Sequence, residues 1–170
     1  MSRFNLQKQT AKVAHVNLRE EKHGEDPVLG VDVKLVADLS NDFLGQLSPT
    51  LKSALYASDV EATGQLSLVD ASQHLPVLRY PQLGPLAWAG EFDAELIFHG
   101  LKKADDVVFE RARVNKIHLA PKEGGTVEVT FRAQVHPGAD GAGALASLLG
   151  DTPKVSVRPV DQAPVGGSVE

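Results

Sequence analysis

The chain has 170 residues, of which 42% are hydrophobic and 23% are charged, and its formal net charge is −5. This length and composition are typical of one folded globular domain and exclude an intrinsically disordered chain. The absence of cysteine excludes a disulfide framework, a thiol nucleophile and a thiolate metal site, and it is consistent with a reducing compartment.

No apolar run approaches the roughly 18 residues of a membrane-spanning helix. Residues 1–12 are also too polar for a secretory signal. We therefore expect a cytoplasmic protein with no membrane contact. The expected domain covers residues 1–160, and the tail at 161–170 is predicted to be disordered.

Basic residues are concentrated at the start of the chain. Residues 1–19 contain Arg3, Lys8, Lys12 and Arg19 and no acidic residue. We predict a basic N-terminal arm, residues 1–12, ahead of an acidic body. Such an arm either contacts phosphate groups or is an ordinary solvated tail, and both interpretations stay open.

Alternation of apolar and polar residues predicts strands at residues 28–37, 90–100 and 126–135. The core-facing residues of the first are Leu29, Val31, Val33, Leu35 and Ala37. Those of the third are Val127, Val129, Phe131, Ala133 and Val135. Each strand has a polar second face, and this predicts antiparallel sheet because strands of a parallel sheet are covered on both faces.

Two further stretches alternate with a break in phase. In residues 113–119 the apolar positions are Val114, Ile117 and Leu119. In residues 12–18 they are Val13, Val16 and Leu18. An odd step of three requires one extra residue, so we predict a β-bulge near Asn115 or Lys116 and another near Ala14 and His15.

The two irregular strands begin similar segments of the chain. Each is followed by a glycine-containing turn, a regular strand and a short predicted helix, at residues 41–47 and 139–150, with Asn41 and Asp140 as candidate caps. The segments are read as two hairpin-helix units, related by duplication or by the constraint of amphipathic alternation alone. A further helical turn is predicted at residues 48–56, with Pro49 in its first turn.

Residues 75–90 contain three of the ten prolines and the single tryptophan. Proline at this density excludes a helix or a central strand and predicts an extended edge or an ordered loop. Tyr80 and Trp88 in this loop either cover an open end of the core or form a partner-binding surface.

Catalytic and metal-binding motifs are absent from the sequence. The six histidines form no HxH, HxxxH or HExxH pair, and there is no Walker loop or G-x-S-x-G motif. We therefore predict no cofactor, no metal and no catalytic residue. Glu91, Asp93 and Glu95 share one face of a predicted strand, which favours a solvated surface and leaves a metal-dependent nuclease as an alternative.

Candidate contacts to nucleic acid or a partner protein come from the second hairpin and the proline-rich loop. The residues are Arg111, Arg113, Lys116, Arg132, Tyr80 and Trp88. Arg111 and Arg113 are expected to project together from one face of their strand. The low aromatic content, 5%, leaves few rings on which bases could stack.

Three blocks of sequence carry a resemblance to a known group of proteins. They are HVNLREEKHGED at 15–26, LPVLRYPQLGPLAW at 75–88 and KEGGTVEVTFRAQVHP at 122–137. Over most of residues 10–137 the chain resembles uncharacterised small proteins of tailed bacteriophages and prophages. These are typically encoded near early genes for recombination or single-strand DNA handling. The resemblance implies a setting in phage DNA metabolism, in the cytoplasm of the bacterial host cell, and it implies no site residues.

The predicted fold is mainly β, an antiparallel sandwich or partly open barrel of about seven strands with two or three short helices. The predicted function is non-catalytic binding in phage DNA metabolism, with single-stranded DNA or a recombination or replication protein of phage or host as partner. An inhibitor of a host antiphage defence complex is an alternative of another class. A homo-oligomer also stays open, because an edge strand or the proline-rich loop could pair with a second copy.

Overall fold

The computed structural model describes residues 4–24, 26–59, 75–102 and 105–160. The disordered tail predicted at 161–170 and the first residues of the predicted arm, 1–3, lie outside these ranges. The elements are β1 (Leu6–Thr10), β2 (Lys12–His23), β3 (Asp26–Ser40), η1 (Asn41–Phe43), α1 (Leu44–Leu47), α2 (Leu51–Leu55), β4 (Tyr56–Ala57), β5 (Val77–Leu78), β6 (Leu86–Trp88), β7 (Phe92–Lys102), β8 (Asp105–Lys122), β9 (Thr126–Val135), α4 (Ala139–Ser147) and β10 (Lys154–Pro159).

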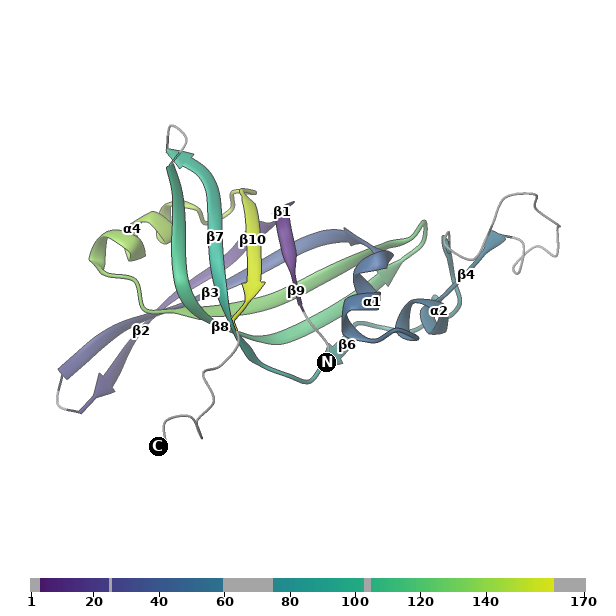
Figure 1. Cartoon of the computed structure of the whole chain (residues 1–170), viewed down its shortest axis with the longest axis horizontal. Helices are drawn as coiled ribbons and strands as arrows, with labels where there is room; N and C mark the ends of the chain where they lie inside the picture. Colours follow the sequence, from purple (N-terminus) through teal and green to yellow (C-terminus); the bar gives the residue numbers. More distant parts are fainter. Residues whose placement is uncertain (1–3, 25, 60–74, 103–104, 161–170) are drawn as a thin grey trace.

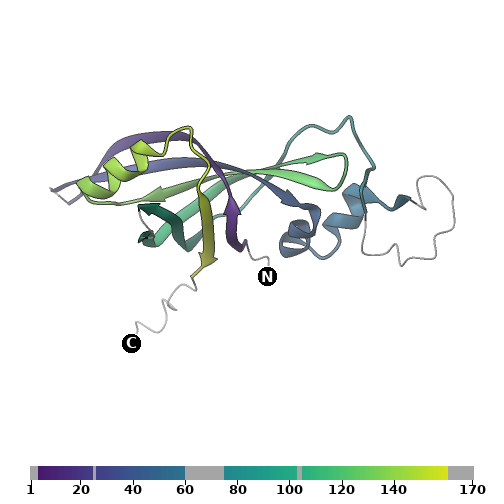
Figure 2. The same ribbon diagram turned by 90° about the horizontal axis from the view of Figure 1, so that it is seen from above.

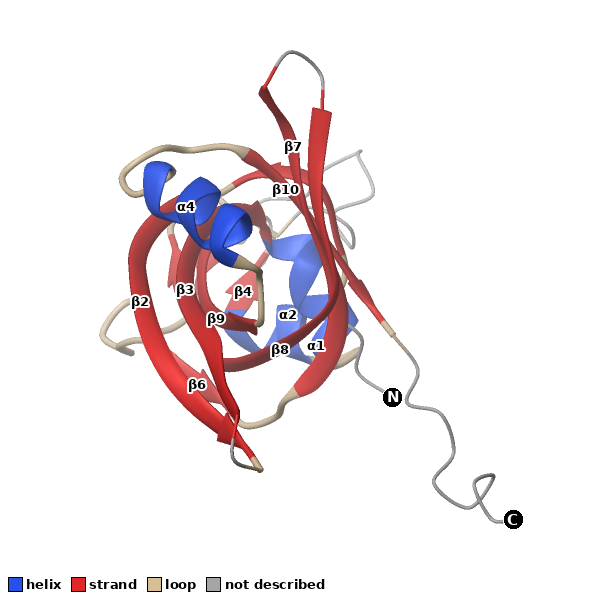
Figure 3. Cartoon of the chain, turned by 90° about the vertical axis from the view of Figure 1, so that its left-hand side faces the viewer, coloured by secondary structure: helices blue, strands red, loops and turns tan. Residues whose placement is uncertain are grey.

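Within the described residues, eight strands form one antiparallel sheet in the order β1-β10-β7-β8-β9-β3-β2, with β6 pairing to β8 beside this path. Strands β4 and β5 form a separate two-stranded ladder. The large sheet curls around an interior, with α4 across one end and α1 and α2 toward the other (Figures 1 and 3). This arrangement confirms the mainly antiparallel β fold with short helices.

The two outermost strands of the sheet, β1 and β2, are consecutive in the chain and are separated only by Ala11. No ladder joins them, so the sheet is not closed. The Ala11 and Val13 amides nevertheless donate to the carbonyls of Pro153 (3.0 Å) and Asp151 (2.9 Å), just before β10. One stretch of chain therefore pairs with β10 through its first part and with β3 through its second, and the sheet is a partly open barrel.

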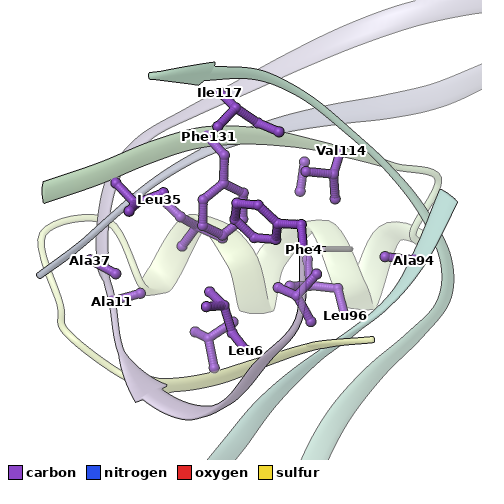
Figure 4. Close-up of a cluster of buried hydrophobic side chains, with 14 of the residues drawn as sticks. Phe4, Leu6, Ala11, Leu35, Ala37, Ala94, Leu96, Val114, Ile117 and Phe131 are labelled. Carbon is purple, nitrogen blue, oxygen red and sulfur yellow. The ribbon is translucent and has the colours of Figure 1, made fainter. Parts of the chain in front are cut away.

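The interior of this barrel contains the side chain of Phe4, which is 2% exposed. Its ring lies 5.1 Å from Phe43, 5.6 Å from Phe92 and 5.0 Å from Phe131 between centroids, and Figure 4 shows it at the centre of the buried cluster. Leu6 is also buried. From Phe4 onward, the segment that we predicted as a basic arm is therefore part of the core and the sheet, because its two apolar side chains gain more by burial than by exposure.

Both predicted bulges are confirmed. The register of pairing shifts between Val13 and His15 on β2 and between Asn115 and His118 on β8. At each place the bulged strand has one residue more than its partner. A third bulge separates Phe109 from Ala112 on β8, opposite Leu96 and Ala94 of β7. The hairpins β2–β3 and β8–β9 lie side by side through the β3–β9 ladder, with Leu35 opposite Phe131.

The tips of these hairpins point to opposite ends of the molecule (Figures 1 and 2). Toward the tip of β2–β3 the inward row leaves the core, since Leu18 is 57% exposed and Leu29 is 37% exposed. The sequence alternation predicts both as core-facing. The alternation that predicts a face does not reveal that the hairpin extends beyond the elements that could cover it.

Helices form where the sequence predicts them, but the caps differ. The Ser40 hydroxyl, not Asn41, accepts from the Asp42 amide at the start of η1. Gly138, not Asp140, is the N-cap of α4 and makes no side-chain cap hydrogen bond. Pro49 precedes the N-cap of α2 at Thr50.

Residues 75–90 form the extended edge that their prolines predict. Strand β6 pairs with β8 at one edge, with Trp88 opposite Ile117. In the described part of the chain, no helix is both long enough and apolar enough to cross a membrane.

Candidate functional site

A groove of about 620 Å³ lies on the outer face of the sheet, over β2, β3, β9 and β8, with Pro85 at its edge. Its lining comes from the polar positions that alternate with the buried ones, such as Thr130 and Arg132 on either side of Phe131. Neither hairpin alone is wide enough to form it. The groove therefore depends on the β3–β9 ladder that places the two hairpins side by side.

Basic side chains form a row across the strands in this groove. His15 lies opposite Lys34, Lys34 opposite Arg132, and Arg132 opposite Asn115, with Lys116 next on β8. We call Lys34, Arg132 and Lys116 the cationic row. Neighbouring strands are about 4.8 Å apart, so the row spans roughly 10 Å perpendicular to the strands.

The two bulges help to build this row. Lys116, in the β8 bulge, has a φ of 51°; with Lys8 it is one of the two non-glycine residues of positive φ in the described chain. A β-bulge re-aims side chains, and a strained backbone conformation of this kind is concentrated at functional positions. In β2 the extra residue Ala14 places His15 on the outer face at the end of the row.

The cationic row makes no ion pair with a carboxylate of the described chain. Among the residues that the structure describes, Lys34, Lys116 and Arg132 make no ion pair, and Arg132 donates its Nε to Asn115 Oδ1 at 2.8 Å. The two carboxylates in the groove are taken by cations outside the row. Asp32 lies 2.9 Å from Arg19 Nε, and Glu128 lies 3.4 Å from Lys122 Nζ.

A second row of polar side chains runs parallel to the first, toward the tip of β2–β3. Asp32 Oδ1 accepts from Gln134 at 3.1 Å, and Gln134 Oε1 accepts from Asn115 at 3.1 Å. Asn115 also donates toward Glu91 at 3.4 Å. Asn115 is buried, and its amide joins this hydrogen-bonded row to Arg132 of the cationic row. The chain of bonds fixes the orientation of the Arg132 guanidinium.

The hydrogen-bonded row continues to the tip of the first hairpin through Glu21, which accepts from Arg19 and from His136. The His136 hydrogen bond, followed by that of Arg19, lowers the pKa of Glu21 from 4.5 to about 2. These contacts attach β2 to the residue that follows β9.

Acidification is expected to weaken this attachment. The folded pKa of Glu21 lies below its unfolded value, so its contribution to stability is present above pH 4.5 and is lost as the pH falls toward 2. Glu21→Gln should therefore lower the melting temperature at pH 6 and lower it much less at pH 2. A difference in melting temperature as large at pH 2 as at pH 6 would contradict this assignment.

The structure places some of the sequence-predicted basic residues in the groove and others outside it. Lys116 and Arg132 lie in the groove. Arg113 instead pairs with Glu91 (2.6 Å) and Asp93 (3.3 Å), and the Glu91 hydrogen bond raises its pKa. Arg111 is exposed within the third bulge, outside the groove, so it does not join the cationic row.

The two aromatic candidates also differ in burial. Trp88 is half-buried and packs against the core, as the core-covering interpretation requires. Tyr80 is 57% exposed in the loop that leads to Pro85. The sequence interpretation missed three groove residues, Lys34, His15 and His118, although their outward phase was visible. The missing information was which strands are neighbours and in what register.

The acids considered for a nuclease are held in ion pairs. Glu91 and Asp93 contact Arg113, and Glu95 lies 3.4 Å from Arg158. Within the described ranges no group of three histidine, aspartate or glutamate residues is placed to hold a metal ion.

A Ser–His–Asp arrangement that no local motif announced lies on β7, β8 and β10. His99 Nε2 is 2.6 Å from Ser156 Oγ, and Nδ1 is 3.3 Å from Asp106 Oδ2. This is the order of groups in a hydrolase triad. However, Ser156 is 1% exposed, and its Oγ accepts from the Lys8 amide of β1 at 3.0 Å. A substrate has no access to the hydroxyl while β1 pairs with β10, so the arrangement fastens β1 to the sheet.

No protein-family model, no curated protein sequence and no solved structure matches the chain. The resemblance to phage proteins stays a prediction from the three sequence blocks.

Proposed function

We propose that the protein is a non-catalytic binding protein that holds the backbone of single-stranded DNA in the outer groove, as part of phage DNA metabolism. The observation that supports this most is the cationic row, which makes no ion pair in the described chain. Phosphate groups are the natural counterions for such a row, and backbone contacts provide most of the affinity of non-specific DNA binding.

The shape of the row favours one strand over a duplex. Lys34, Arg132 and Lys116 follow a single line across three strands, which matches one line of phosphates. No exposed phenylalanine, tyrosine or tryptophan lines the groove, because Phe131 is fully buried. The DNA would therefore be held by contacts between cations and phosphates and not by base stacking. We expect little preference for base sequence.

Salt dependence provides the test. Single strands give a slope of about −0.7 in log K against log salt for each phosphate neutralised, so three cations predict a slope of about −2. Affinity should fall about 20-fold between 50 and 200 mM salt. Fluorescence anisotropy of a labelled oligothymidylate measures this directly.

A matched pair of variants assigns the binding to the groove. Lys34→Gln, Lys116→Gln and Arg132→Gln together should weaken binding roughly 3- to 160-fold and flatten the salt slope. The control Lys8→Gln, Lys154→Gln and Arg158→Gln removes the same charge from exposed residues on β1 and β10, and it should bind as the wild type does. Equal weakening in both variants would contradict the proposal.

A single substitution separates binding from folding. A residue other than glycine at a positive φ destabilises the folded state by about 1–2 kcal/mol. Glycine avoids this strain but loses about 0.5–1 kcal/mol of folding free energy through its larger backbone entropy in the unfolded chain. Lys116→Gly should therefore keep the free energy of unfolding within about 1 kcal/mol of the wild type and still weaken DNA binding.

A comparison of partners tests the proposal as a whole. If the protein binds a purified recombination protein but does not retain single-stranded DNA at low salt, the partner is a protein and the DNA proposal is wrong.

A further inference from the structure

Two imidazoles border the cationic row. His15 lies at its end, opposite Lys34, and His118 lies two residues after Lys116 on β8; both are exposed and line the groove. Neither belongs to the hydrogen-bonded row that crosses the sheet. Both are therefore positioned to contact a ligand that lies along the row.

The hydrogen bond of His118 defines which nitrogen faces the ligand. Its Nδ1 is 3.1 Å from the Lys116 carbonyl, and because a carbonyl only accepts, Nδ1 carries the hydrogen. Nε2 is then the proton acceptor of the neutral ring. Protonation adds an N–H at Nε2 without breaking the bond to Lys116, so the charged form fits the same geometry.

We propose that His15 and His118 are two further phosphate-binding groups of the groove, which engage the DNA backbone when their imidazoles are protonated. This inference rests on the proposed function.

Five charged side chains share the groove with the two imidazoles: the cations Lys34, Arg132 and Lys116, and the carboxylates Asp32 and Glu128, each of which is already paired with a cation outside the row. A phosphate bound in the groove attracts a protonated imidazole. By linkage, DNA binding takes up protons, and a lower pH strengthens binding.

The test compares pH 5.5 with pH 8, using oligothymidylate because its bases do not titrate in this range. Three cations at pH 8 predict a salt slope of about −2, and five at pH 5.5 predict about −3.5. Affinity at constant ionic strength should rise roughly 2- to 30-fold on acidification, the range that two exposed charge pairs supply.

Variants assign the effect to the two groove histidines. His15→Gln with His118→Gln should retain the slope and affinity of the wild type at pH 8 and lose the response to pH. The control His136→Gln removes an imidazole outside the groove and should keep the response.

The outcomes separate this inference from the function on which it rests. Binding with a slope of about −2 at both pH values, or a pH response that survives in the double variant, overturns the inference and leaves the DNA-binding function intact. No binding of oligothymidylate at either pH overturns both.

Discussion

Replacing Phe4 with alanine is expected to lower the free energy of unfolding by about 3–5 kcal/mol, the cost of truncating a buried phenylalanine. Phe4 is 2% exposed, and its ring contacts Phe43, Phe92 and Phe131. These partners come from η1, β7 and β9, so the cavity would lie where the sheet folds back on itself. Collapse of the surroundings cannot fill such a cavity without moving several strands.

Urea unfolding measures the change. The midpoint should fall with an unchanged m-value, because the surface exposed on unfolding stays nearly the same. Phe4→Leu is the matched control, since it keeps most of the buried volume and should cost less than half as much. A loss below about 1 kcal/mol for Phe4→Ala would show that the first residues are not part of the core.

Removing the hydroxyl of Tyr56 is expected to cost about 1–3 kcal/mol, the penalty for leaving buried polar groups unpaired. The fully buried Tyr56 places its oxygen 2.8 Å from the Lys122 carbonyl and 2.9 Å from that of Thr126, and it accepts from the Lys122 amide. Lys122 and Thr126 are opposite each other beside the β8–β9 turn. The hydroxyl therefore ties both strands of the second hairpin to the α2–β4 segment.

Thermal or urea unfolding of Tyr56→Phe tests this tie, because the substitution removes one oxygen and keeps the ring. Burial raises the pKa of Tyr56 above 10.0. The protonated form is thus favoured in the folded state, and its contribution is present below pH 10 and is lost as the pH rises further. Tyr80→Phe, at an exposed hydroxyl, should have no comparable effect. Equal stability of Tyr56→Phe and the wild type would contradict the assignment.

Local features of the fold were accessible from the sequence. Strand β9 alternates in burial along its whole length, as its residues predict, and the odd spacing of Val114 and Ile117 located the β8 bulge within two residues. Such features depend on side chains a few positions apart, for which alternation is a direct signal.

Long-range pairing was not accessible in this way. The Lys8 amide contacts Ser156 across 148 residues, and no local pattern distinguishes β1, with four polar residues out of five, from a solvated arm. The same limit applies to the candidate site. Arg113 was a reasonable cation on an outward position, but its neutralisation by Glu91 depends on the β7–β8 register.

The β3–β9 ladder gives the groove a mechanical property. Its lining is divided between residues before 35 and residues after 84, which approach each other only in the folded chain. A ligand bound along the groove would contact both parts of the chain. It would have to dissociate before the two parts could separate. Occupancy and folding are therefore expected to rise and fall together, with the bound strand protecting the molecule against heat in proportion to the logarithm of its concentration.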